Sequence, residues 1–204
     1  MRILSVVFKS ALFILTIIAL YQEIYVNGIV LFSAFYYFTI QSNILAALCL
    51  LLFIFIPPKK GRLRCLIRGS SLLAVTLTCI VYNFVLYRIY LDWGTAGYTF
   101  SRTVSHVIVP IGFILDWLLF DKHKIMKWKD IFVWLFYPVV YSLCSLYAGF
   151  RYGVSIYFFL SIANGYGTAL KWIGIILFGL VLIGLLFIRI DKWIGRKKVN
   201  SKII

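Results

Sequence analysis

Six long apolar runs dominate this sequence and leave few folds open to it. To within a few residues, they cover 3–22, 31–56, 69–90, 102–120, 130–149 and 167–190. A helix needs about 20 mostly apolar residues to cross the hydrocarbon core of a bilayer. Strands of a membrane barrel would be shorter and would alternate apolar with polar residues. The pattern therefore predicts an all-α fold, a polytopic membrane helix bundle with six transmembrane helices.

Composition excludes an ordinary soluble domain. Of the 204 residues, 63% are hydrophobic and 13% are charged, whereas an average soluble domain carries about 25% charged residues. Such a chain lacks the polar side chains that would cover a soluble fold. We expect residues 1–190 to form a six-helix transmembrane domain in the cell membrane and residues 191–204 to form a basic cytoplasmic tail.

The charge of the chain indicates a topology. There are 21 Lys and Arg against 6 Asp and Glu, a net charge of +15. Seventeen of the 21 basic residues fall at the N-terminus, in the second and fourth connections and near the C-terminus; the other four are Arg88, Arg102, Arg151 and Lys171. The positive-inside rule then places both termini in the cytoplasm. Membrane lipids are the expected partners of these charges, and nucleic acid is not expected.

Recognised cofactor and metal motifs do not occur. The sequence has no glycine-rich nucleotide loop and no metal-protease helix motif, and its four Cys form no CxxC pair. We expect no cofactor and no metal. His123 lies in a basic connection and is expected to be solvated.

Polar residues inside a membrane helix are costly, so each is a functional candidate. The second run contains Thr39, Gln41, Ser42 and Asn43 within five positions. Thr39 and Asn43 are four residues apart and share a helix face. If the helix begins at residue 31, Thr39 lies about 12 Å from its outer end.

His106 lies about 6 Å from the outer end of the fourth run, and Glu23, Asn83 and Arg88 fall in the same layer. A hydroxyl, an imidazole, amides and a carboxylate at one depth are typical of a nucleophile-and-base site. The alternative is structural: a membrane Thr often bonds its own helix, and amides often join helices.

The acid that would orient His106 is less clear from the sequence. Asp116 is ten residues away, about 15 Å along a helix, and is therefore too far. Glu23 and Asp92 are closer candidates. We expect Asp116 to form an ion pair, with Arg64 or Arg68 as its partner.

Several separated motifs carry a family resemblance: YFTIQSNIL (37–45), SHVIVPIGFILDWLLF (105–120), FYPVVYSL (136–143) and NGYG (164–167). They resemble the bacterial branch of the androgen-induced six-helix membrane protein family, along nearly the whole chain. Residues 154–161 depart from it, because they lack the prolines and the aspartate typical of that branch. Animal members are similar to threonine-type hydrolases of fatty acid esters of hydroxy fatty acids, so the resemblance implies catalytic roles for Thr39 and His106.

Three hypotheses follow. In the first, the chain is an intramembrane hydrolase of lipid esters, in which Thr39 attacks, His106 is the base, and Gln41, Ser42, Asn43 and Asn83 bind substrate or donate to the oxyanion. In the second, a transporter or lipid-binding protein uses the same polar cluster as a binding site. In the third, a non-catalytic membrane component binds a partner through its basic face.

Overall fold

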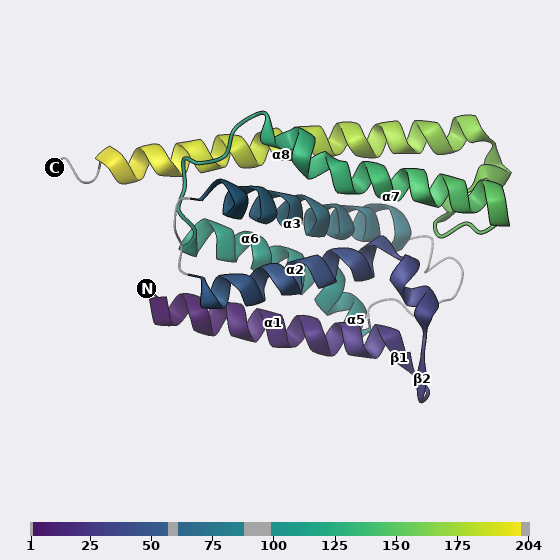
Figure 1. Ribbon diagram of the computed structural model, residues 1–204, viewed down its shortest axis with the longest axis horizontal. Coiled ribbons are helices and arrows are strands. Elements are labelled where there is room, and N and C mark those ends of the chain that lie inside the picture. Colours follow the sequence, from purple (N-terminus) through teal and green to yellow (C-terminus); the bar gives the residue numbers. More distant parts are fainter. Residues whose placement is uncertain (1, 57–60, 88–98, 201–204) are drawn as a thin grey trace. The chain divides into compact units, whose positions relative to one another are not determined.

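The computed structural model describes residues 2–56, 61–87 and 99–200, and forms two compact units, 1–122 and 123–204. Six helices in the described residues are long and apolar enough to cross a membrane. The all-α, six-helix prediction is confirmed, and the protein is a multi-pass membrane protein. Figure 1 shows the helices of the first unit, which are α1 (Arg2–Ile24), α2 (Phe38–Phe55), α3 (Arg62–Val81) and a helix built from α5 (Phe100–Thr103), η3 (Val104–Ile108) and α6 (Val109–Phe120).

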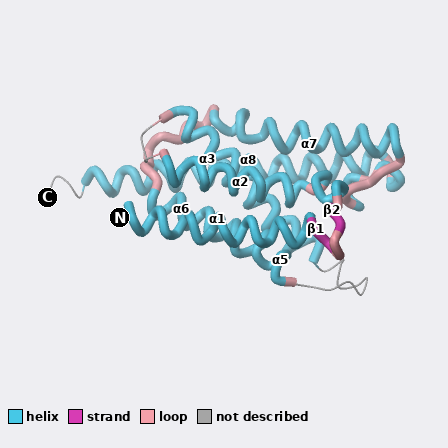
Figure 2. Tube along the Cα trace, turned by 60° about the horizontal axis from the view of Figure 1, so that its bottom comes forward, coloured by secondary structure: helices cyan, strands magenta, loops and turns pink. Residues whose placement is uncertain are grey.

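The second spanning helix begins later than its apolar run suggests. A two-stranded hairpin, β1 (Tyr25–Val26) and β2 (Ile29–Val30), follows α1 and is drawn in magenta in Figure 2. Its turn residues Asn27 and Gly28 both have positive φ, which suits a two-residue hairpin turn. A short 3-10 helix, η1 (Phe32–Tyr36), comes next, and α2 starts at Phe38.

This start corrects the predicted depth of Thr39. Tyr37 is extended (φ −78°, ψ 132°), so the helix cannot run through it from residue 31. Thr39 therefore lies in the first turn of α2. Ile40 packs with Ala34 against Leu20 of α1, which fixes this first turn on the end of α1.

Two π-helical turns interrupt the spanning helices of the first unit. In η3, the Val109 N–H donates to the Val104 carbonyl, and in η2 (Tyr82–Leu86), which extends α3, the Tyr87 N–H donates to the Tyr82 carbonyl. Pro110 is the second residue after η3. A proline ring clashes with the carbonyl four residues earlier, here that of His106, and a wider turn relieves this clash.

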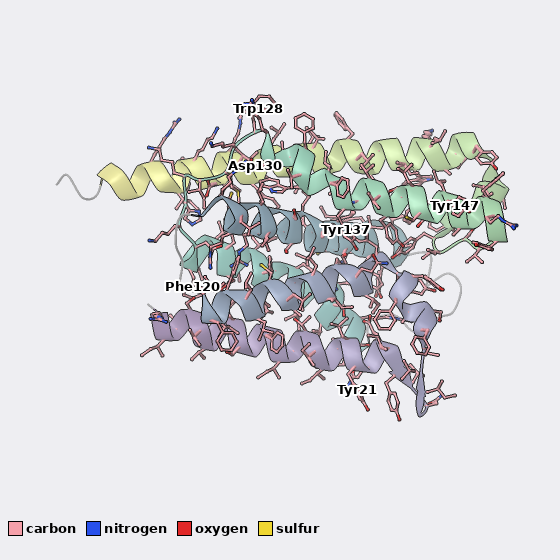
Figure 3. All side chains as sticks on the ribbon, in the orientation of Figure 1. Tyr21, Phe120, Trp128, Asp130, Tyr137 and Tyr147 are labelled. Atoms are coloured by element: carbon pink, nitrogen blue, oxygen red, sulfur yellow. The ribbon has the colours of Figure 1, made fainter. Side chains whose placement is uncertain are left out.

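A buried ionic cluster joins the helix ends at the opposite end of the first unit. Lys9 Nζ lies 2.7 Å from Asp116 Oδ1, and Arg68 pairs with both Asp116 and Asp121. Arg64 pairs with Asp121 at 3.4 Å. The prediction of an Asp116 ion pair is thus confirmed with Arg68, whereas Arg64 binds the other aspartate. Figure 3 labels Phe120 at this end, where its ring lies 5.0 Å from Lys9 Nζ.

Asp121 remains charged within this cluster. Burial alone would raise the pKa of its carboxyl, but Arg68 and Arg64 oppose burial and hold that pKa below its ordinary value. The carboxylate therefore stabilises the fold above its unfolded pKa of about 4. This contribution disappears as the pH falls through the lower, folded pKa.

The second unit contains α7 (Asp130–Tyr152) and α8 (Tyr166–Asn200), joined by η4 (Phe158–Leu160) and η5 (Ile162–Asn164). Figure 3 labels Asp130 at the start of α7 and Tyr147 towards its end. Helix α8 continues past residue 191, where the basic tail was expected to start.

His123 is not solvated as predicted. Its side chain is buried, with Nδ1 3.2 Å from Asp191 Oδ1, and Asp191 Oδ2 also accepts the N–H groups of Ile125 and Met126. The sequence missed this because a carboxylate on α8, 68 residues away, holds the connection that carries His123.

We predict that Arg68→Met destabilises the protein strongly. The substitution removes the cation shared by two buried carboxylates, and breaking a buried pair costs about 3–5 kcal/mol. The melting temperature in detergent should fall well below that of the parent. Arg189→Met, which changes an exposed arginine of α8, should leave it nearly unchanged. Equal melting temperatures for the two variants would contradict a structural role for the cluster.

Candidate functional site

Thr39 and His106, 67 residues apart in sequence, meet in the first unit. Thr39 Oγ1 lies 3.2 Å from His106 Nε2. Thr39 comes from the first turn of α2, and His106 from η3, about 9 Å along the helix that begins at Phe100. This is hydrogen-bond reach for a hydroxyl and a base. Thr39 is half-buried and His106 is 6% exposed.

The protein main chain selects the tautomer of His106. Nδ1 lies 2.9 Å from the Arg102 carbonyl oxygen, and a carbonyl can only accept a hydrogen bond. Nδ1 must therefore carry the hydrogen. In the neutral ring Nε2 is then the lone-pair nitrogen, and it accepts the hydrogen bond of the Thr39 hydroxyl.

The ring of His106 is also held from its face. Tyr82, the first residue of η2, stacks on it with ring centroids 3.8 Å apart and an angle of 29° between the planes. Both π-helical turns therefore contribute to the same site. Tyr82 carried no distinguishing signal in the sequence, because an aromatic residue in an apolar run is typical of ordinary packing.

Asn43 connects the two main-chain segments of the site. Its Nδ2 donates to the Thr39 carbonyl at 2.9 Å and to the Ser105 carbonyl at 3.2 Å. The side chain is fully buried, and its Oδ1 has no hydrogen-bond partner among the described residues. One amide nitrogen thus ties the residue that carries the hydroxyl to the helix that carries the imidazole.

Asn83 makes a similar contact from the third spanning helix. Its Nδ2 donates to the Cys79 carbonyl at 2.7 Å within its own helix and to the His106 carbonyl at 3.3 Å across the bundle. Asn43 and Asn83 therefore both lie at the site, where their amides bond main-chain carbonyls.

The remaining predicted polar residues lie around this centre. Ser42 Oγ donates to the Thr39 carbonyl at 3.0 Å and lies 2.8 Å from Thr78 Oγ1. Gln41 Nε2 donates to the Phe35 carbonyl at 2.8 Å and so fastens η1 to the start of α2. Their roles towards a substrate stay predictions.

Glu23, one of the two expected acids, does not orient the imidazole through a contact that the structure gives. Glu23 Oε1 accepts a hydrogen bond from Ser105 Oγ at 3.0 Å, next to the histidine. The Arg102 carbonyl takes the orienting position at Nδ1. Asp92 and Arg88 lie outside the described residues.

The fold and this site define a class: a multi-pass membrane protein with six candidate spans and a hydroxyl–imidazole pair between two of them. No protein-family model matches the chain. The comparisons with curated proteins and with solved structures also give no match. The site therefore has to be interpreted from its own geometry.

The tautomer can be tested by nitrogen-15 NMR of protein labelled at histidine. The chain has two His, so His106→Gln assigns the spectrum by removing one set of signals. We predict a neutral His106 ring with the hydrogen on Nδ1. Thr39→Val should keep this tautomer and shift the Nε2 signal, because the ring loses only its hydroxyl donor. A ring with the hydrogen on Nε2 would contradict the arrangement.

Proposed function

We propose that this protein is an intramembrane hydrolase of lipid esters, with Thr39 as nucleophile and His106 as general base. The observation that carries the proposal is the 3.2 Å contact between the Thr39 hydroxyl and Nε2, with Nδ1 held by the Arg102 carbonyl. A threonine hydroxyl is a weak nucleophile, so a base within reach is required. The motif resemblance of residues 37–45 and 105–120 implies roles for the same two residues, although no protein-family model matches the chain.

The chemistry proceeds in two halves. Thr39 Oγ1 attacks the ester carbonyl while its proton moves to Nε2. This attack converts the ester carbonyl into a tetrahedral oxyanion. The oxyanion collapses, the C–O bond to the alcohol breaks, and the proton on Nε2 passes to the departing alcohol. Water then repeats the sequence on the threonine ester: Nε2 takes a proton from water, the acid is released, and the proton returns to Thr39.

The position of Thr39 favours the negative charge that develops on the oxyanion. It is the second residue of α2, whose capping residue Tyr37 supplies no side-chain cap. The positive end of the helix dipole therefore lies at the reacting hydroxyl. Because Gln41, Asn43 and Asn83 already donate to main-chain carbonyls, this helix end supports the oxyanion more directly than their amides do.

The alternative is a transporter or lipid-binding protein that uses the same polar cluster as a binding site. It needs no contact between a nucleophile and a base. The paired hydroxyl and imidazole, with the tautomer set for proton transfer, favour the hydrolase. Retained lipid binding without any turnover would favour the alternative.

We predict that Thr39→Val and His106→Ala each lower ester hydrolysis by about 1,000-fold or more, as expected when a nucleophile or its base is removed. Purified protein in detergent is offered p-nitrophenyl esters of fatty acids and branched fatty acid esters, and release of the alcohol is followed. Mass spectrometry of a reaction stopped early should find the acyl group on Thr39.

The matched control is Thr16→Val. Thr16 is another buried threonine in a spanning helix, and its hydroxyl donates to the Leu12 carbonyl of the same helix at 2.7 Å. This variant should retain parent turnover. Equal turnover in the parent, Thr39→Val and His106→Ala would refute the hydrolase.

We further propose that both termini face the cytoplasm, so that the site lies in the outer half of the bilayer. The support is the distribution of the 21 basic residues, 17 against 4. A C-terminal green fluorescent protein fusion in bacteria should fluoresce, and a C-terminal alkaline phosphatase fusion should be inactive. The reverse pattern would overturn this orientation.

A further inference from the structure

We propose that Asn43 and Asn83 are positioning residues, which hold His106 at Thr39 by donating to two main-chain carbonyls whose regular N–H partner is missing at Pro110. The inference rests on the proposed function, since it assigns the residues that align its two reacting groups. It gives the two amides a role different from direct contact with substrate.

The need for these donors follows from the chain at residues 104–110. In an α-helix, the N–H of residue 110 would bond the His106 carbonyl, but a proline has no N–H. In η3 the Val109 N–H bonds Val104, five residues earlier, in place of Ser105. In that π-helical pattern, the donor to the Ser105 carbonyl would be the N–H of residue 110, which the proline lacks. The carbonyls of Ser105 and His106 therefore lose their regular partners together.

The two amides occupy these two carbonyls. Asn43 Nδ2 lies 3.2 Å from the Ser105 oxygen, and Asn83 Nδ2 lies 3.3 Å from the His106 oxygen. One amide comes from α2 and the other from η2, so two neighbouring helices hold adjacent peptide groups of η3. A carbonyl without a hydrogen bond is unfavourable within a bilayer, so these contacts fix the rotation of η3 and with it the direction of the His106 ring.

The second hydrogen of Asn43 gives the arrangement its geometric role. It binds the carbonyl of Thr39 itself at 2.9 Å. The main chain of Thr39 and the main chain of Ser105, the residue before His106, are therefore connected through one planar amide group. The same amide leaves its Oδ1 buried without a partner among the described residues, a cost that a residue selected for stability alone would avoid.

The test compares Asn43→Leu, Asn83→Leu and a control, Asn164→Leu, in the full chain. Asn164 Nδ2 also donates to a main-chain carbonyl, that of Phe158 at 3.3 Å, but it lies in the second unit. Both site variants should lose about 10- to 100-fold in kcat, as expected for a displacement of about 1 Å between reacting groups. Their KM should change less than about twofold. The control should keep the parent kcat.

The spectroscopic readout is independent of turnover. In the two site variants, the nitrogen-15 signal of His106 Nε2 should move towards its position in Thr39→Val, because a displaced η3 no longer holds Nε2 at the Thr39 hydroxyl. A protein that is only less stable would keep the parent Nε2 signal in its folded fraction. Asn83 is half-buried, so Asn83→Leu tests the inference even if Asn43→Leu does not fold.

A rescue experiment isolates the role of the proline. Pro110→Ala restores an N–H that can donate to the His106 carbonyl. The fold-loss in kcat caused by Asn83→Leu should then be at least threefold smaller in the Pro110→Ala background than in the parent. An equal cost in both backgrounds would contradict the proposed link between Asn83 and Pro110.

The failures of the two proposals can be distinguished. If Thr39→Val and His106→Ala turn over ester at the parent rate, the hydrolase is wrong. If those two variants are inactive while Asn43→Leu and Asn83→Leu keep the parent kcat and the parent Nε2 signal, the hydrolase stands and the positioning role is overturned.

Discussion

Inside a bilayer no water is available to bond main-chain carbonyls, and Pro110 removes a donor from within a spanning helix. The first unit accommodates this loss with a π-helical turn, η3, and with side-chain amides from two neighbouring helices. The same turn carries His106. The demand for main-chain hydrogen bonds thus determines how the imidazole is presented to Thr39.

The first unit carries a polar cluster at each end of its helices, and the two clusters have different roles. At one end, Lys9, Arg68, Asp116 and Asp121 neutralise one another in a buried network that joins α1, α3 and α6. At the other end, the hydroxyl and the imidazole are uncharged groups that hydrogen bond across helices. A charged network restricts helix movement, whereas a neutral donor–acceptor pair can exchange a proton, which is what the proposed chemistry requires.

The sequence predicted the all-α class, the six spans and the grouping of Thr39 with His106. These predictions succeed because hydropathy and residue type are local properties of the chain, and because a polar residue within an apolar helix is costly enough to stand out. The sequence erred on the start of α2, since residues 29–36 are as apolar as a spanning helix. It also misjudged His123, because the carboxylate that buries it lies on a distant helix.

The sequence by itself determined that this protein crosses a membrane, how many helices do so and which few residues are polar within them. The tertiary structure alone decided which of those polar groups meet. The Nε2 contact with the Thr39 hydroxyl, the Tyr82 stack and the amide bonds from Asn43 and Asn83 to the Ser105 and His106 carbonyls all depend on the angular placement of π-helical turns. Apolar periodicity does not encode that rotation, because a π-helical turn and an α-helical turn bury similar apolar surface.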